Sequence, residues 1–163
     1  MTEIQLHKLD RGLRWFLSAF LLVLSIGVSV GLVYVCTTTE INPQGTVEHY
    51  AGSDTDEFDI PEKYPKSLEA MLLTTHTHII SFAVIFVLLG ALFHFNSMVT
   101  GKWKTVIMIE PLIATLVTFC SIWGIRYCHP SFAYLTILSG TLMYLSFYLM
   151  SIILLYDLLI KDL

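Results

Sequence analysis

The chain has 163 residues and a formal net charge of −4, and 55% of its residues are hydrophobic while only 13% are charged. Soluble domains carry about 25% charged residues. The composition therefore excludes an ordinary soluble globule, because lipid must cover part of so much apolar surface. The chain also has no basic run and no zinc-finger spacing, so nucleic acid is not an expected partner.

Four apolar segments are long enough to cross the hydrocarbon core, which requires about 20 residues per helix. The first segment follows basic residues, as a signal peptide does, but its apolar run is longer than a signal core, so a retained helix is expected. Short connections between the last three segments favour antiparallel neighbours. We predict an all-α membrane protein, an antiparallel four-transmembrane-helix bundle formed by a single domain over residues 1–163, with helices over about 11–36, 67–97, 104–127 and 131–160.

The placement of lysine and arginine predicts how the bundle is oriented. Most of these residues lie near the termini and beside Lys102, whereas Lys63, Lys66 and Arg126 lie at the other ends of the helices. Both termini are therefore expected on the cytoplasmic side of the membrane, with the loop over 37–66 outside. This loop is expected to pack on the bundle or meet a partner, with a solvated loop as the alternative. Its acidic residues are Glu40, Glu48, Asp54, Asp56, Glu57, Asp59 and Glu62.

Two histidines share one face of the second predicted helix. His76 and His94 are about five helical turns apart, which places them about 27 Å apart along the axis, one near each membrane surface. Imidazoles ligate haem iron axially, and the protein tunes the iron through these ligands. The spacing predicts haem b with His76 and His94 as metal ligands. The alternatives are a role with another metal or a quinone, and a structural role in which His76 and His78 bond to the outer loop at the interface and His94 snorkels to the inner surface. His78 lies about 200° around the helix from His76, on a face that looks suited to packing or lipid contact.

A second helix that supplies iron ligands is not evident, because the third and fourth predicted helices carry no histidine within the membrane. The outer candidates for a sixth ligand are His49, His78 and His129, and the inner candidate is His7. A homodimer that pairs equivalent histidines is a further route. Arg126 is a candidate partner for a haem propionate, since arginine binds carboxylates in a bidentate manner; headgroup anchoring or a pair with the acidic loop is its alternative. The predicted cofactor-binding residues are His76, His94, His78, His129 and Arg126.

Three further features carry expectations. Glu110 is expected to pair with a basic residue at the inner surface, with a proton-carrying or quinone-contacting carboxylate as the alternative. Gly27 and Gly31 have small-xxx-small spacing, which predicts a face for close helix packing. Cys36 and Cys128 fall at outer helix ends, where unpaired thiols are favoured over a disulfide.

The segments NPQGTVEHYAG, from Asn42, and YPKSLEAMLLTTHTHI, which includes His76 and His78, resemble small four-helix inner-membrane proteins of Gram-negative bacteria. These proteins are mostly uncharacterised and occur with c-type cytochromes and respiratory electron-transfer components. The resemblance implies a subunit of an electron-transfer assembly, and it singles out His76 and His78 together with Gly45, His49 and Tyr50.

The expected function is therefore a membrane subunit of a respiratory electron-transfer system. It would bind haem b through the histidines of the second helix and relay electrons between membrane and periplasmic proteins. The alternatives are a non-redox accessory or assembly subunit and a membrane protein that handles metals at the outer surface. A subunit is expected rather than a stand-alone enzyme, membrane lipid is an expected partner, and a homo-oligomer is an open alternative.

Overall fold

The structure is a computed structural model that describes residues 5–53 and 60–161. All regular secondary structure in these residues is helical, which confirms the predicted all-α class. Four of the described helices are long and apolar enough to cross a membrane: α1 (Arg11–Thr39), α3 (Leu68–His94), α4 (Gly101–Tyr127) and α5 (Phe132–Leu159). A short 3₁₀ turn, η1 (Leu6–Lys8), precedes them, and a short helix, α2 (Pro43–Ala51), follows α1.

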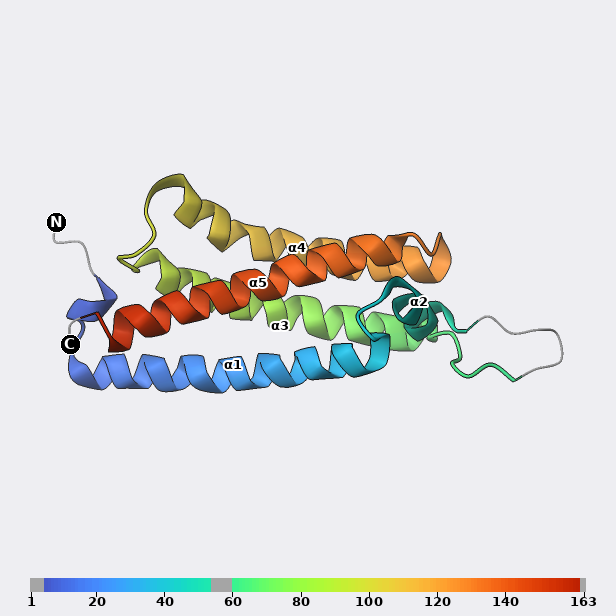
Figure 1. Ribbon diagram of the computed structural model, residues 1–163, viewed down its shortest axis with the longest axis horizontal. Coiled ribbons are helices and arrows are strands. Elements are labelled where there is room, and N and C mark those ends of the chain that lie inside the picture. Colours follow the sequence, from blue (N-terminus) through green and yellow to red (C-terminus); the bar gives the residue numbers. More distant parts are fainter. Residues whose placement is uncertain (1–4, 54–59, 162–163) are drawn as a thin grey trace.

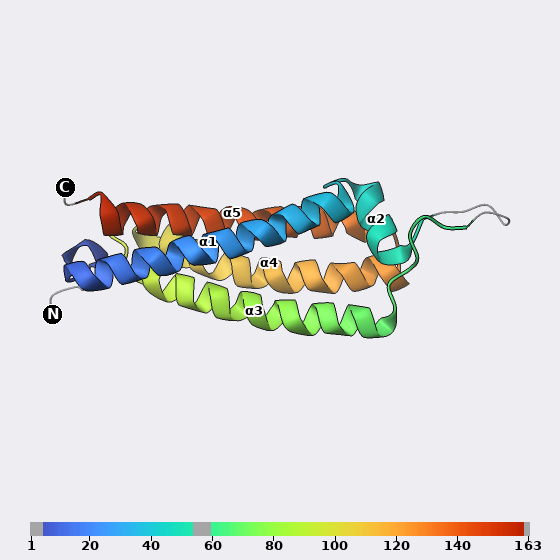
Figure 2. The same ribbon diagram turned by 90° about the horizontal axis from the view of Figure 1, so that it is seen from below.

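The four long helices lie along one axis, and helices that follow one another in the chain run in opposite directions (Figure 1). α5 is the central helix, since it packs against α1, α3 and α4, whereas α1 and α3 hardly contact each other. Figure 2 shows α2 across one end of the bundle, and η1 and the last turn of α5 at the other end. We call these the α2 end and the η1 end.

Small hydroxyl residues join α4 to α5. Thr118 donates a hydrogen bond to Ser139 at 2.8 Å, and the hydroxyls of Ser121 and Thr136 are 2.7 Å apart. Gly124 sits directly against the ring of Phe132, where a Cβ would lie 2.5 Å from a ring carbon. Small and hydroxyl side chains allow membrane helices to approach closely and to bond across the interface. They explain why α4 and α5 form the closest helix pair.

The ends of the helices differ from the predicted ones by a few residues. α1 continues to Thr39, beyond the predicted end at residue 36, and it stops where Glu40 adopts a left-handed conformation with φ of 54°. α3 ends at His94 rather than at 97, because the side chain of Asn96 accepts hydrogen bonds from the backbone of Met98 and Val99 and turns the chain. α4 begins at Gly101, before the predicted residue 104.

The helix α2 was not predicted and lies within the expected outer loop over 37–66. Asn42 caps it by accepting a hydrogen bond from the backbone of Gly45 at 2.6 Å, and Pro43 occupies its first turn, where proline is favoured. Gly45 is needed here because a Cβ would lie 2.4 Å from the carbonyl oxygen of Thr39. In the same loop Glu48 pairs with Lys63 at 3.3 Å. The predicted loop residues Asp54, Asp56, Glu57 and Asp59 lie outside the described residues.

Candidate functional site

A cavity of about 970 Å³ lies beneath α2, between α1 on one side and α3, α4 and α5 on the others. Small-molecule and cofactor sites have volumes of about 300–1,000 Å³ and combine an apolar lining with a few polar groups. This cavity has that character, since aliphatic and aromatic side chains dominate its lining. The lining residues on which the following argument depends are Gly27, Gly31, His49, Tyr50, Lys66, His78, Phe82 and Tyr144.

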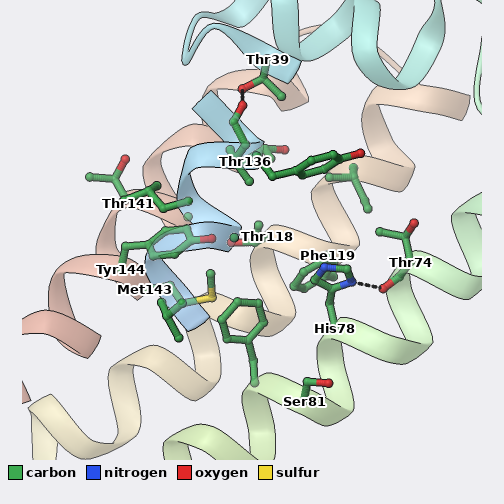
Figure 3. A pocket seen from close by; sticks show the side chains of 18 of the residues that line it. Thr39, Thr74, His78, Ser81, Thr118, Phe119, Thr136, Thr141, Met143 and Tyr144 are labelled. Carbon is green, nitrogen blue, oxygen red and sulfur yellow. Dashed lines mark hydrogen bonds between the residues drawn. The ribbon is translucent and has the colours of Figure 1, made fainter. Parts of the chain in front are cut away.

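His78 extends from α3 into this cavity, across from Tyr144 of α5 (Figure 3). Its Nδ1 lies 2.8 Å from the carbonyl oxygen of Thr74, one helical turn earlier. A carbonyl can only accept a hydrogen bond, so Nδ1 carries the proton and Nε2 keeps a free lone pair. The ring also packs against Phe119, with ring centres 5.4 Å apart. Histidines that ligate metals are commonly oriented in this way, by donating the other ring N–H to a carbonyl.

His49 reaches the same cavity from α2. Its pKa is lowered from 6.5 to about 4, first because burial disfavours the charged ring and then because Lys66 and Lys63 repel a positive charge. The imidazole is therefore neutral near pH 7. Its ring packs edge-on against Tyr50, with centres 4.8 Å apart, and burial raises the pKa of Tyr50 to about 12. The neutral imidazole of His49 and the ring of His78 thus line one cavity from different elements.

Lys66 brings a positive charge to the cavity at its α2 end. Its backbone is fixed on both sides: its N–H donates to the carbonyl of Tyr50 at 3.0 Å, and its carbonyl accepts from Nε of Arg126 at 3.0 Å. The guanidinium of Arg126 also lies 5.0 Å from the ring centre of Tyr127. Arg126 therefore ties the end of α4 to the segment that carries Lys66, and it is Lys66, not the predicted Arg126, that lines the cavity.

The remaining predicted ligands lie elsewhere. His76 and His94 are exposed on the surface of α3, and neither lines the cavity. His129 is exposed in the α4–α5 connection, where its Nδ1 accepts a hydrogen bond from the backbone of Ser131 at 3.1 Å. His78, which is also exposed, thus lines the same cavity as His49, whereas His76, His94 and His129 do not. In the described part of the chain, no three His, Cys, Asp or Glu side chains form a group that could hold a metal ion.

The glycines of α1 do not form the packing face that their spacing predicts. A Cβ on Gly27 would meet no atom within 4 Å, and one on Gly31 would meet only the hydroxyl of Tyr144, at 4.0 Å. Both glycines line the cavity. Their missing side chains widen this space instead of allowing another helix to approach.

Two acidic side chains, Asp157 near the end of α5 and Glu110 of α4, do not line the cavity. Asp157 of α5 is fully buried and accepts two hydrogen bonds from Ser97, one of them from the backbone N–H at 2.9 Å. It also lies 3.5 Å from His7 and 3.9 Å from Lys161. Sequence reasoning missed Asp157, although it is the lone charged residue in the sequence of α5. Glu110 accepts a hydrogen bond from Ser146 and forms no ion pair with a described basic residue, contrary to the predicted pair.

The three cysteines, Cys36, Cys120 and Cys128, are free thiols.

The comparison with curated proteins and the comparison with solved structures each found no match. A family model for a transmembrane helical domain matches residues 40–163, which include α2, α3, α4 and α5. The match covers more than half of the chain, and the chain therefore belongs to this family of transmembrane helical domains and is a multi-pass membrane protein.

Proposed function

We propose that the protein is a membrane subunit of an electron-transfer system and that it binds b-type haem in the cavity beneath α2. The observation that carries the proposal is that two histidine side chains, His78 from α3 and His49 from α2, line this one cavity. The helix α2 thus supplies a second element with a candidate iron ligand. This is needed because, of the four long helices, α3 alone carries histidines. Haem bound there would provide one-electron transfer.

The fit of the residues to haem rests on three features. Nε2 of His78 has a free lone pair because Nδ1 is bonded to Thr74. His49 stays neutral, as an iron ligand must. The space is large enough and mostly apolar, which suits a flat macrocycle. We therefore assign the ligand roles to His78 and His49 and leave His76 and His94 as surface residues of α3.

We further propose that the protein lies in a bacterial inner membrane with α2 on the periplasmic side. The basis is the excess of lysine and arginine at the η1 end, where residues such as Lys8, Arg11 and Lys102 lie. With this orientation the cavity lies close to the periplasmic surface. A soluble electron-transfer protein that docks near α2 would then approach the haem.

The test compares two histidines of the same helix. The protein is purified in detergent from a host that supplies haem, and reduced-minus-oxidised visible spectra are recorded. We expect haem b bands that His78→Ala abolishes and that His76→Ala, the matched control two residues away, leaves intact. His49→Ala should convert a low-spin six-coordinate spectrum to a high-spin one. The absence of haem b bands from the wild-type protein purified from that host would refute the proposal.

Quinone is the second candidate, and the hydroxyl groups at the cavity favour it. Tyr144 and Thr118 line the apolar space opposite His78, so a quinone ring would find both hydrogen-bond donors and an acceptor there. Solvent extraction of the purified protein and chromatography of the extract would detect it. A stoichiometric quinone without haem bands would select this alternative, and the absence of both would favour the non-redox accessory subunit.

A further inference from the structure

The cavity combines one cationic end with a long apolar body. Lys66 is the basic residue among its described lining residues, and it stands at the α2 end. Gly27 and Gly31 widen the opposite part, between α1 and α3. From this juxtaposition we infer that the site takes an amphipathic acid, with its carboxylate on Lys66 and its apolar body between α1 and α3, and that it is loaded from the bilayer. The inference rests on the proposed function, in which haem, with its propionates, is the acid.

Lys66 is suited to hold a carboxylate. Its backbone is fixed by Tyr50 and Arg126, so the ammonium is held near the cavity rather than on a free loop. Its positive charge contributes to the lowered pKa of His49, which lines the same cavity. The neighbouring Lys63 differs, because it already pairs with Glu48 at 3.3 Å. Between the described residues, Lys66 forms no ion pair.

The apolar body has room between α1 and α3. These two helices hardly contact each other, although both line the cavity. A Cβ on Gly27 would meet nothing within 4 Å, and Phe82 lines the space from α3. Since α1 and α3 are both long and apolar enough to span a membrane, a gap between them would open to lipid. An apolar molecule dissolved in the bilayer can enter through it without crossing water, which is the favourable route for such a solute.

The two features fix the orientation of the ligand. A carboxylate is strongly stabilised at the membrane surface and near an ammonium, whereas hydrocarbon disfavours it. The acidic edge of the ligand therefore points toward α2 and Lys66, and the apolar edge points toward Gly27. If haem is the ligand, its propionates would lie toward the α2 end, and His78 and His49 would hold its iron.

The first arm of the test varies the carboxylate and Lys66 together. Haem-free protein in lipid nanodiscs is titrated with iron protoporphyrin IX and with its dimethyl ester, which lacks the acidic groups. Lys66→Met should raise the dissociation constant of the free acid about tenfold, equivalent to one charge-assisted hydrogen bond, and leave that of the ester unchanged. Lys63→Met is the matched control and should change neither. Equal effects of Lys66→Met on both ligands, or no effect on either, would overturn the carboxylate site.

The second arm tests the space beside α1. Gly27→Leu and Gly31→Leu should weaken the binding of both the acid and the ester, because the new side chain fills the cavity while meeting little protein. Val33→Leu is the control, since Val33 is an exposed residue of the same helix that does not line the cavity. Unchanged binding in both glycine variants would overturn the placement of the apolar body.

A third titration separates this inference from iron ligation. Metal-free protoporphyrin IX, followed by its fluorescence, has the carboxylates but no iron, so His78→Ala should leave its affinity unchanged while it weakens the iron complex. If His78→Ala leaves the iron complex unchanged while Lys66→Met still weakens both free acids, haem ligation fails and the acid site stands. If His78→Ala weakens the iron complex while Lys66→Met does not, the acid site fails and ligation stands.

Discussion

The environment of His49 predicts a specific dependence of stability on pH. Its pKa is about 4 in the folded protein, against an ordinary value of 6.5. Between these two values the unfolded chain binds a proton that the folded chain does not, so the free energy of unfolding falls as the pH falls from 6.5 toward 4, and it does not depend on His49 above pH 6.5. The difference of about 2.5 pKa units sets an upper limit of about 3.4 kcal/mol at ~1.36 kcal/mol per unit. Because His49 is only half-buried, solvent screening reduces this to about 1–2 kcal/mol.

Two measurements check the reasoning. In detergent, the unfolding midpoint should fall by about 2–6 °C between pH 7 and pH 4.5 through His49, and His49→Gln should remove that part of the decrease. Histidine NMR titration should show His49 titrating near pH 4, well below its ordinary value of 6.5. Lys66→Met should raise the pKa of His49 but keep it below 6.5, because desolvation is the larger cause. A wild-type His49 that titrates near 6.5, or one that Lys66→Met leaves unchanged, would refute the environment described for the cavity.

Two further substitutions test the packing of the bundle. Gly45→Ala places a Cβ 2.4 Å from the carbonyl oxygen of Thr39 and should lower the free energy of unfolding by about 1–3 kcal/mol. Its control, Gly27→Ala, meets no atom within 4 Å and should leave the unfolding midpoint nearly unchanged. Equal midpoints for the two variants would contradict the position of α2. Asp157→Ala removes the acceptor of both Ser97 hydrogen bonds and should lower the free energy of unfolding by about 2–4 kcal/mol, as measured by chemical unfolding in detergent. Asp157→Asn should recover part of this loss. An alanine variant as stable as the wild type would show that the buried carboxylate is not needed for stability.

The long helices followed from sequence because the physical requirement is simple. A segment that crosses the hydrocarbon core must be long, apolar and internally hydrogen-bonded, and composition alone reveals this. The short helix α2 could not be predicted in this way because it is neither long nor apolar. Its signal was local: Asn42 and Pro43 form a standard helix start, which is readable when a loop is inspected for caps as well as for turns.

The candidate site could be predicted from the sequence only in part. Helical periodicity correctly separated the face of His76 from that of His78, but it contained no information on which face meets a cavity. The two predicted iron ligands lie on the face shared by His76 and His94, whereas His78 lines the cavity. The spacing of Gly27 and Gly31 was similarly ambiguous, since small residues can admit either a neighbouring helix or empty space. Arg126 was placed near the correct end of the bundle, but its contact with the backbone of Lys66 depends on a fold-back of the segment between α2 and α3.

The sequence by itself determined that this chain is a helical membrane protein with four segments long and apolar enough to span the membrane, because lipid imposes these properties one segment at a time. Only the tertiary structure decided that α2 folds over the end of the bundle, that α1 and α3 stay apart, and that His49, Lys66 and His78 line one cavity. These facts depend on contacts between residues distant in the chain, such as Gly45 against Thr39 and Lys66 between Tyr50 and Arg126. Local pattern cannot specify such contacts, because each one is set by how two separate elements pack.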